Sequence, residues 1–283
     1  MTRGVPKAGF RAPRGQKMVD KIVNVQPGIV DESETDSQID SRIRDRFEIL
    51  DSMTSDAIDG DIRALIVSGP AGLGKSYTVE QQIGDNPKHQ IVRGYVRATG
   101  LVKLLYSKRH IGQVLVLDDA DDVFGDEVSL GLLKAACDST DRRVISYMSE
   151  GVLIDEEGDV IPKQFQYNGS VIFITNMDFD NMIDRGHKLA PHLNALISRA
   201  HYIDLKMKTR RDYMIRIRQV IGQGLLKNIG LDNQGQDDVI KFIKYNASTL
   251  RELSLRIALK IGALRKKNVT NWKKRAYVTC CKI

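Results

Sequence analysis

The sequence lacks the features that would place it in a membrane or in an oxidising compartment. No apolar run approaches the roughly 18 residues that span a bilayer, so we expect no transmembrane helix and no membrane partner. The first 20 residues are basic but contain no apolar segment of the kind found in secretory signal peptides. Three cysteines are too few for a disulfide scaffold, and they lack the spacing of zinc ligands. These absences predict a protein of the reducing cytoplasm.

The bulk composition is that of a globular protein. Hydrophobic residues make up 42% of the chain and charged residues 28%, which provides enough apolar material for a sizeable core. These proportions exclude wholesale disorder, a collagen-like fibre and a coiled-coil rod. A length of 283 residues indicates one or two domains.

The formal net charge of +7 is divided unevenly along the chain. Residues 1–30 carry six basic residues and one acidic residue, residues 31–204 carry 18 and 30, and residues 205–283 carry 19 and five. An acidic middle between two basic ends indicates parts with different roles. The basic ends either neutralise nucleic-acid phosphates or pack against an acidic neighbour, and both interpretations stay open.

The hydrophobic pattern divides the chain into three parts. Residues 1–40 have little apolar periodicity and predict a disordered tail, first basic and then acidic. Residues 41–205 predict an α/β domain with a parallel five-stranded sheet, because short apolar runs alternate with helical periodicity. Residues 206–283 predict a basic helical domain, whose last helix would begin with a capping box of Thr249 and Glu252. The expected strands cover residues 64–67, 91–96, 114–117, 171–174 and 201–205, and the expected helices cover residues 39–58, 78–83, 101–106, 128–137, 209–227, 237–246 and 249–266.

One loop carries a specific nucleotide-binding motif. Residues 69–76 fit G-x-x-x-x-G-K-[ST] between a predicted strand and a predicted helix. Backbone N–H groups of such a loop converge on phosphate oxygens at a helix N-terminus. We expect Lys75 to reach the β- and γ-phosphates of ATP and the Ser76 hydroxyl to ligate Mg²⁺. The predicted nucleotide-binding residues of this loop are Gly69, Pro70, Ala71, Gly72, Leu73, Gly74, Lys75, Ser76 and Tyr77.

Two acidic residues directly follow the apolar run 114–117. Nucleotide hydrolysis at such a loop needs one carboxylate for the metal and a second group that orients the attacking water. We therefore predict that Asp118 holds Mg²⁺, directly or through water, and that Asp119 is the general base. The second position is more often Glu in such enzymes, so the shorter Asp argues for slower turnover rather than against nucleotide binding.

Asn176 closes another buried strand, after the run 171–174. Neighbouring strands of a parallel sheet end on the same side, where ligands bind. Asn176 is therefore expected beside Asp119, where its amide can hydrogen-bond the water or the γ-phosphate. The alternative, that Asn176 is an ordinary turn residue, is less favoured because the phosphate loop and the two aspartates are present in the same sequence.

The order of these motifs resembles that of AAA+ ATPases. Asp-Asp-Ala-Asp from Asp118 resembles the Asp-Glu-Ala-Asp box of clamp-loader subunits, and Ser198-Arg199 resembles their Ser-Arg-Cys motif. By this resemblance Arg199 is an arginine finger, which contacts the γ-phosphate bound to a neighbouring subunit, and Arg251 is a sensor arginine, which contacts nucleotide in its own subunit. The resemblance also implies ATP hydrolysis and a C-terminal helical lid.

An arginine that acts on a neighbouring subunit implies a homo-oligomer, and head-to-tail contacts that close would give a ring of roughly five to seven subunits. The segments around residues 47–76 and 250–264 also resemble ATPases of tailed bacteriophages, which would place the chain in the host cytoplasm.

The substrate stays open between two classes. Residues 97–103 hold the position that faces the ring channel in this superfamily, and they lack the aromatic residue of protein-threading members, which argues against an unfoldase. Basic residues around Trp272 in the helical domain favour phosphate neutralisation and base stacking. The first interpretation is therefore a motor or loader in DNA replication or recombination, with DNA as a partner through the helical domain and the N-terminal tail, or with a replication protein as partner.

The alternative is a protein-remodelling or assembly ATPase that has no nucleic-acid substrate. A third interpretation, given Asp119, is an ATP-binding switch with little turnover. Residues 149–170 predict a hairpin with an acidic tip, which disfavours phosphate contact there and favours a protein-facing or structural role. The adjacent Cys280 and Cys281 are interpreted as an incidental pair near a frayed terminus rather than a redox pair.

Overall fold

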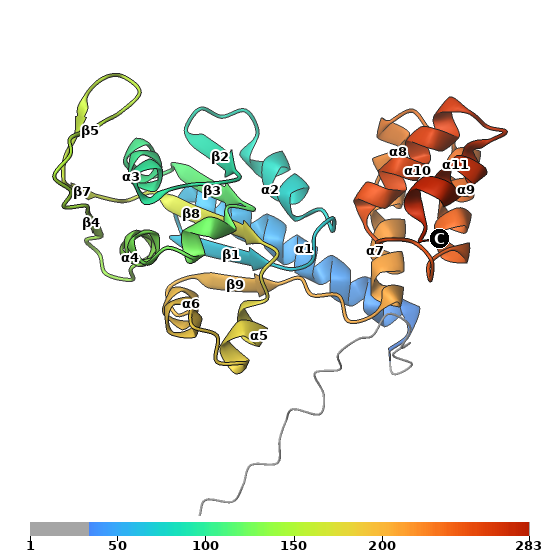
Figure 1. The fold of residues 1–283 in the computed structure, drawn as a ribbon, viewed down its shortest axis with the longest axis horizontal. Helices are drawn as coiled ribbons and strands as arrows, with labels where there is room; N and C mark the ends of the chain where they lie inside the picture. The colour runs from blue at the N-terminus through green and yellow to red at the C-terminus, as the bar shows by residue number, and fades with distance from the viewer. Residues whose placement is uncertain (1–33, 283) are drawn as a thin grey trace, which may run out of the picture.

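The larger part of the molecule is built around a parallel β-sheet (Figure 1). Within residues 34–282, which the computed structural model describes, the strands of this sheet are β1 (Ala64–Ser68), β2 (His89–Arg93), β3 (Val114–Asp118), β8 (Ser170–Thr175) and β9 (His201–Asp204). Their order is β2-β3-β8-β1-β9, and every neighbouring pair is parallel. The α/β class and the five-stranded parallel sheet expected from the sequence are therefore confirmed.

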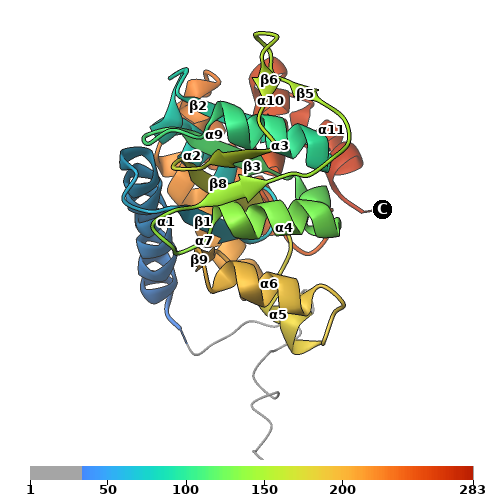
Figure 2. The ribbon, with the colours of Figure 1, turned by 90° about the vertical axis from the view of Figure 1, so that its left-hand side faces the viewer.

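Helices cover both faces of the sheet. They are α1 (Asp36–Asp59), α2 (Lys75–Ile83), α3 (Ala98–Ser107), α4 (Glu127–Ala136), α5 (Phe179–Asp184) and α6 (Ala190–Ile197). Because side chains alternate along a strand, Leu65 and Val67 of β1 pack with α1 and α2. Ala64 and Ile66 face the other way, into the core formed with α3, α4 and α6. Figure 2 shows α4 on the side of the strands opposite to α1. Burial on both faces explains why β1 and β3 are unbroken apolar runs.

Helices that follow the last strand form a separate core. Within residues 205–282 they are α7 (Arg210–Gly222), α8 (Leu225–Asn228), α9 (Asn233–Tyr245), α10 (Leu255–Lys267) and α11 (Trp272–Cys280). Trp272 is only 2% exposed and its ring lies 5.4 Å from that of Phe242. The prediction that Trp272 stacks bases at the surface is therefore wrong. Cys280 and Cys281 are buried in the same core rather than frayed.

Helix α10 begins at Leu255 rather than at residue 249. The Ser254 side chain caps it by accepting a hydrogen bond from a backbone N–H of its first turn. Thr249 belongs to the preceding turn, because its N–H and its hydroxyl both donate to the carbonyl of Asn246. The predicted capping box of Thr249 and Glu252 is therefore wrong.

Two further differences concern the helical part. The single helix predicted over residues 209–227 divides into α7 and α8 at Gly224, whose φ of 104° no helix can accommodate. Helix α11 was not predicted. Its buried face consists of only three residues four apart, namely Trp272, Ala276 and Cys280, in a segment that is otherwise mostly polar.

Helix α1 begins earlier than its periodicity predicts. Thr35 and Gln38 form a capping box that starts the helix at Asp36, so residues 36–40 are helical rather than part of the predicted disordered tail. Residues 1–33 of that predicted tail lie outside the described residues. None of the helices within residues 34–282 combines the length and apolarity needed to cross a bilayer.

Strand β2 ends at Arg93 rather than at residue 96, because Gly94 has a φ of 86° and leaves the extended conformation. Helix α3 then begins at Ala98. The loop between them is residues 94–97, and it carries Tyr95, which is 67% exposed with the Arg97 guanidinium 5.8 Å from its ring centre. Residues 97–103 contain no aromatic residue, but the loop of the structure begins earlier and carries Tyr95, which weakens the argument against an unfoldase.

The predicted hairpin is present and its strands are short. They are β4 (Val144–Ser146), β5 (Leu153–Ile154), β6 (Val160–Ile161) and β7 (Gln164–Gln166). Strand β4 pairs with β7 and β5 pairs with β6, both antiparallel. The acidic tip, residues 155–159, lies with the end of α3 along one cavity of about 440 Å³.

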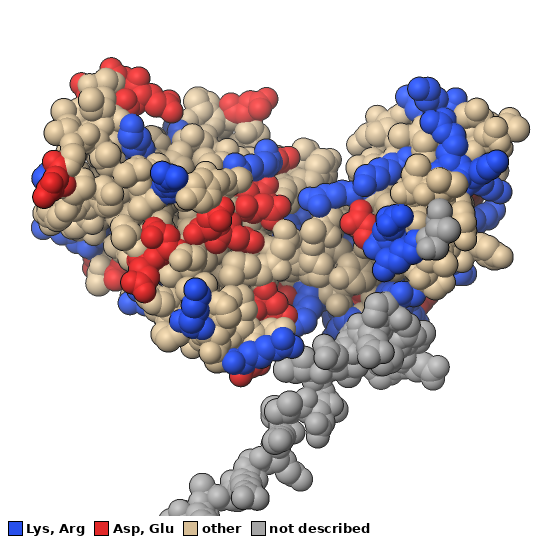
Figure 3. Space-filling view, in the orientation of Figure 1, with Lys and Arg blue, Asp and Glu red and all other residues tan. Residues whose placement is uncertain are grey.

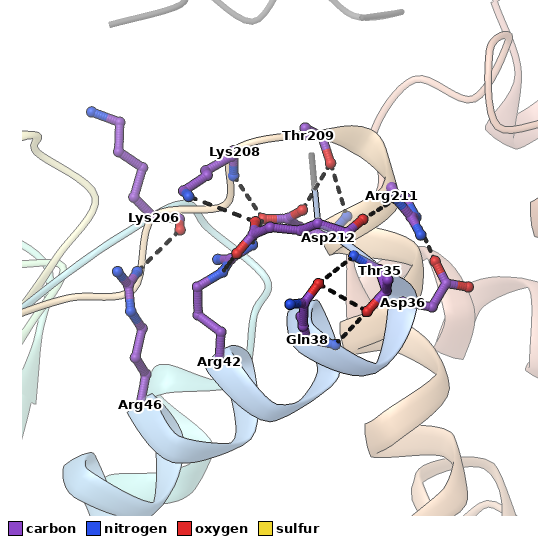
Figure 4. Close-up of polar contacts among 11 residues, drawn as sticks. Thr35, Asp36, Gln38, Arg42, Arg46, Lys206, Lys208, Thr209, Arg211 and Asp212 are labelled. Atoms are coloured by element: carbon purple, nitrogen blue, oxygen red, sulfur yellow. Dashed lines mark hydrogen bonds and ion pairs between the residues drawn. The ribbon is translucent and has the colours of Figure 1, made fainter. Parts of the chain in front are cut away.

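A polar cluster joins the start of α1 to the segment that enters α7 (Figure 4). Asp212, 1% exposed, accepts hydrogen bonds from Arg42 Nη2 at 3.0 Å, the Thr209 hydroxyl at 2.8 Å and the Lys208 N–H at 2.9 Å. Arg42 Nη2 also donates to Glu34 at 2.9 Å, so one guanidinium joins carboxylates of two segments. Buried charges need such pairing, and the cluster therefore ties α1 to the helical part.

We expect Asp212→Ala to lower the free energy of unfolding by about 3 kcal/mol, because it leaves Arg42 half-buried without its buried partner. Asp36→Ala, which removes an exposed carboxylate from Arg211 in the same cluster, should cost less than about 1 kcal/mol. Urea denaturation of both variants measures the difference. Equal losses would contradict the central position of Asp212.

Candidate functional site

The predicted phosphate loop connects β1 to α2, as its sequence indicates. Its three glycines, Gly69, Gly72 and Gly74, have φ of 151°, 75° and 98°, which side chains rarely allow. Gly74 is the N-cap of α2 and offers no side chain, so the first N–H groups of this nine-residue helix are not capped by it. Such a helix start attracts anions through its N–H groups and its dipole.

A cavity of about 380 Å³ lies beside the loop, between the α/β part and the helical part. The predicted residues in its wall are Ala71, Gly72, Gly74, Lys75, Ser76, Tyr77, Asp119 and Asn176. Gly69, Pro70 and Leu73 belong to the loop but not to this wall. Helices α7, α8 and α10 and the turn between the first two supply the other side, through Arg216, Val220, Gln223, Leu225, Leu255, Arg256 and Leu259.

The strand order brings three predicted residues into one hydrogen-bonded chain. Strand β8 lies between β1 and β3, so Asn176 at its end stands between the phosphate loop and the acidic strand end. Asn176 accepts a hydrogen bond from Lys75 Nζ at 2.9 Å and donates one to Asp119 Oδ1 at 2.7 Å. The prediction that Asn176 lies beside Asp119 is confirmed.

Asp119 has a φ of 53°. Among residues 34–282 it is the one non-glycine residue with a positive φ. Its N–H donates to the Ile174 carbonyl at 2.9 Å, which holds the backbone in this conformation against the neighbouring strand β8. Residues in sparsely populated backbone regions persist only where their surroundings enforce them, and they concentrate at functional sites. The carboxylate is exposed toward the cavity.

The two predicted metal ligands lie together. The Ser76 hydroxyl donates to Asp118 Oδ1 at 2.8 Å, so two hard oxygen atoms stand side by side at the loop. Arg93 Nε donates to the other carboxylate oxygen at 2.9 Å, and Arg93 also pairs with Glu80. Among residues 34–282 no group of three or more acidic, His or Cys side chains could hold a metal alone. One hydroxyl and one carboxylate suit Mg²⁺, which keeps waters and phosphates as its remaining ligands.

Lys75 is 5% exposed and folds into its own loop, where it donates to the carbonyls of Gly69 and Pro70. Burial lowers the pKa of Lys75 to about 8, against the opposing attraction of Asp119 and Asp118. The ammonium is therefore protonated below about pH 8. An anion bound beside it would replace these carbonyls and raise its pKa, since opposite charge favours the charged form.

The helical part contacts the phosphate loop directly. The Leu255 N–H donates to the Gly72 carbonyl at 2.8 Å, and a Cβ at Gly72 would lie 2.7 Å from that of Ser254, which no side chain tolerates. Arg216 Nε donates to the Leu73 carbonyl at 3.2 Å, and burial lowers the pKa of Arg216 to about 10. No carboxylate within residues 34–282 pairs with Arg216, which instead lies over the Phe47 ring at 3.3 Å.

Arg251 does not reach this cavity. It precedes α10, it is exposed, and its N–H donates to the Cys280 carbonyl at 2.9 Å, so its backbone is attached to the end of α11. Because α10 begins at Leu255, the arginine of its first turn is Arg256, which lines the cavity wall and approaches Gly72. The predicted Arg251 is therefore absent from the wall of this cavity, and Arg256 is the arginine of α10 that lines it.

Arg199 lies at the end of the sheet opposite to the phosphate loop. It follows α6 and precedes the amino end of β9, whereas the phosphate loop follows the carboxyl end of the parallel strand β1. Its Nη1 donates to the Ala195 carbonyl at 2.7 Å, and Asp138 lies 3.9 Å from its Nε. Arg199 is therefore separated from the cavity of its own chain by the length of β9, about 13 Å.

Three arginines of the site escaped the sequence prediction. Arg93 and Arg216 come close to the loop only through strand pairing and helix packing, and no local pattern marks them. Arg256 was detectable in principle, because Ser254 is a good N-cap two residues before it.

No protein-family model matches the chain. The chain is 35% identical over 242 residues to the uncharacterized 36.7 kDa protein of the nrdC–mobD intergenic region of Enterobacteria phage T4. The aligned region covers 83% of this chain and 74% of the phage protein. A phage protein among its relatives agrees with the expected resemblance to phage-encoded proteins.

Two solved structures resemble the fold at low sequence identity. NtrX from Brucella abortus in complex with ATP is 12% identical with a TM-score of 0.47, and the match covers 88% of this chain and 56% of the NtrX chain. The RuvB Holliday junction branch migration motor of Thermotoga maritima is 15% identical with a TM-score of 0.44, covering 89% of this chain and 72% of that chain. This chain therefore spans little more than half of the NtrX chain.

Proposed function

The chain belongs to the same family as the phage T4 36.7 kDa protein, and we propose that it binds and hydrolyses ATP as an oligomeric AAA+ enzyme. The observation that carries this proposal is the meeting of Lys75, Asn176 and Asp119 in one hydrogen-bonded chain beside the glycine loop. Chance glycine loops do not bring a lysine, a carboxylate and an amide together at the carboxyl edge of a parallel sheet.

The loop and Lys75 would hold the triphosphate. The N–H groups at the start of α2 and the ammonium of Lys75 neutralise phosphate oxygens, and Lys75 exchanges its contacts with the Gly69 and Pro70 carbonyls for the phosphates. Ser76 and Asp118 would hold Mg²⁺, which supplies charge neutralisation at the phosphates when bound. Arg93 then gives up its hydrogen bond to Asp118 and keeps its pair with Glu80.

Asp119 and Asn176 would act on the attacking water. The Asp119 carboxylate accepts the proton of the water as general base, while the Asn176 amide orients the carboxylate to which it already donates. The side chain of Asp is one methylene shorter than that of the Glu common in such enzymes. The left-handed backbone at Asp119 sets where this shorter carboxylate lies.

Arginines from both sides would complete the site. Arg256, in the first turn of α10, would contact the nucleotide of its own chain, and the buried Arg216 would fix the helical part against the loop carbonyl. Arg199 cannot reach its own cavity, so its role as a finger requires a neighbouring copy of the chain. A head-to-tail contact that brings it there would close into a ring.

For the substrate of this motor we favour DNA metabolism, in which nucleotide state would change the grip of the ring on DNA or on a replication protein. The basic helical part supports this choice through its charge (Figure 3). A protein-remodelling role is the second candidate, because Tyr95 and Arg97 are exposed in the loop between β2 and α3.

The proposed base is tested by Asp119→Asn. We expect this variant to bind ATP and to lose turnover by about 10²- to 10⁴-fold, because the amide cannot accept the proton. Radiolabelled ATP retained on a filter, together with phosphate release, separates binding from hydrolysis. Asp122→Asn, at an exposed carboxylate three residues on, should hydrolyse at the wild-type rate. Unchanged hydrolysis by Asp119→Asn would remove its role.

The choice of Arg256 over Arg251 is tested by a matched pair. Arg256→Ala should weaken ATP affinity about fivefold or more, since a charge-assisted contact to phosphate is lost, while Arg251→Ala should bind normally. A fluorescent ATP analogue titrated into both proteins measures the two affinities. If only Arg251→Ala weakened binding, the assignment from helix α10 would be overturned.

The neighbouring-subunit role of Arg199 is tested by mixing inactive variants. Arg199→Ala and Lys75→Ala should each lose turnover, but an equal mixture should recover roughly a quarter of the sites, because a Lys75→Ala subunit still supplies Arg199 to its neighbour. Arg185→Ala, an exposed arginine of the same part of the chain, is the control and should stay active alone. Active Arg199→Ala protein, or a mixture with no recovery, refutes the role.

A further inference from the structure

A groove of about 620 Å³ runs between α9 and α11, away from the phosphate loop. Helix α9 contributes residues at helical spacing to one side and α11 contributes one turn to the other. The residues that line it are Asp238, Lys241, Phe242, Tyr245, Asn246, Lys273, Lys274 and Tyr277. Its polar and aromatic rim has no part in the proposed ATP site.

The cations of the groove have no carboxylate partner within residues 34–282. Lys241, Lys273 and Lys274 are exposed and form no ion pair there. The one acid of the groove, Asp238, accepts a hydrogen bond from Arg265 at 2.8 Å, and this hydrogen bond lowers the pKa of Asp238. The carboxylate is thus already paired with Arg265, and Lys273 attracts it without forming an ion pair. Across residues 233–282 there are twelve basic and three acidic residues, so the groove lies in a positive field.

Two tyrosine rings stand out from the rim. Tyr245 is 89% exposed and Tyr277 is 45% exposed. The core of the helical part does not include them: Phe242, which lines the groove, packs against Trp272 with 5.4 Å between the ring centres. The Tyr245 ring and the exposed part of the Tyr277 ring therefore offer planar surfaces next to lysines that form no ion pair.

We propose that the groove between α9 and α11 binds single-stranded nucleic acid. The lysines neutralise successive phosphates, and unpaired bases stack on Tyr245 and Tyr277. A duplex keeps its bases stacked on one another and cannot use these rings. Lysines act as point charges without the geometry that reads base edges, so binding does not depend on sequence.

An acidic protein segment fits these observations less well. Such a segment would gain from the lysines, but it would gain little from a tyrosine that is 89% exposed and projects from the rim. The floor that an amphipathic helix would need is already covered, since Phe242 is only 8% exposed. The combination of unpaired cations with outward rings favours a polyanion that carries aromatic bases.

The proposal deepens the DNA role proposed above, but it uses residues outside the ATP site. Oligonucleotide binding at the groove can therefore be tested independently of ATP hydrolysis. The test is accordingly made on the full chain without nucleotide, and ATP turnover of each variant is measured separately. A variant that loses oligonucleotide binding and keeps its basal ATP turnover separates the two proposals.

The probe is a fluorescein-labelled oligothymidylate of about 16 nucleotides, followed by anisotropy at two salt concentrations. We expect Lys273→Glu with Lys274→Glu to weaken binding at least tenfold and to flatten the salt dependence, because two phosphate contacts are lost. Tyr245→Ala should weaken binding about fivefold or more, whereas Tyr245→Phe, which keeps the ring, should bind as the wild type does.

The matched control is Lys88→Glu with Lys188→Glu, which makes the same charge change at exposed positions of the α/β part. If this control weakened binding as much as the groove pair, net charge alone would bind the probe and the site would be refuted. Equal binding of a duplex, or displacement of the probe by poly-glutamate at the same charge concentration, would also overturn the proposal. The latter result would assign the groove to an acidic protein.

Discussion

The position of β8 between β1 and β3 is the constraint on which the rest of the site depends. Parallel pairing aligns the carboxyl ends of these three strands, so a lysine after one, an aspartate after another and an asparagine between them must meet. If β1 and β3 were adjacent in the sheet, Asn176 would not lie between Lys75 and Asp119 and could not hydrogen-bond both. These three strands are buried along their whole length, and this burial holds their ends in place for hydrogen bonds of 2.7 to 2.9 Å.

The second side of the site comes from a different core, and the joint between the two is small and specific. The Gly72 carbonyl accepts from Leu255, and the missing side chain of Gly72 is what allows Ser254 to approach. Arg216 adds a contact to the neighbouring carbonyl, while the cluster around Asp212 ties the same helix to α1. The phosphate loop and the helical part are therefore in direct contact, and the proposed coupling between nucleotide and partner would pass through these contacts.

The local features of the site were predictable, and so was the meeting of Asn176 with Asp119 at the strand ends, but the contacts of the arginines were not. Glycine spacing, Lys75 and the two aspartates occupy one strand–loop unit each, so their pattern survives in the sequence. The start of α10 was misplaced because two capping signals lie five residues apart, at Thr249 and Ser254. Thr249 was already engaged by the turn after α9, and this contact appears only in the folded chain. Arg216 had no pattern to reveal it, because its partner is a backbone carbonyl 143 residues away.

The excess of basic residues after residue 204 now separates into groups with different physical roles. Arg216 and Arg256 face the phosphate loop, and Arg211 and Arg265 are paired with carboxylates. The charges of Arg211 and Arg265 are balanced by these carboxylates and add little attraction for a polyanion outside the chain. The lysines of α9 and α11 that line the groove have no such partner within the described residues, so they contribute to the outward field of the helical part together with other exposed and unpaired cations such as Lys266 and Lys267. The same charge total would mean much less for a partner if those lysines were paired as Arg265 is.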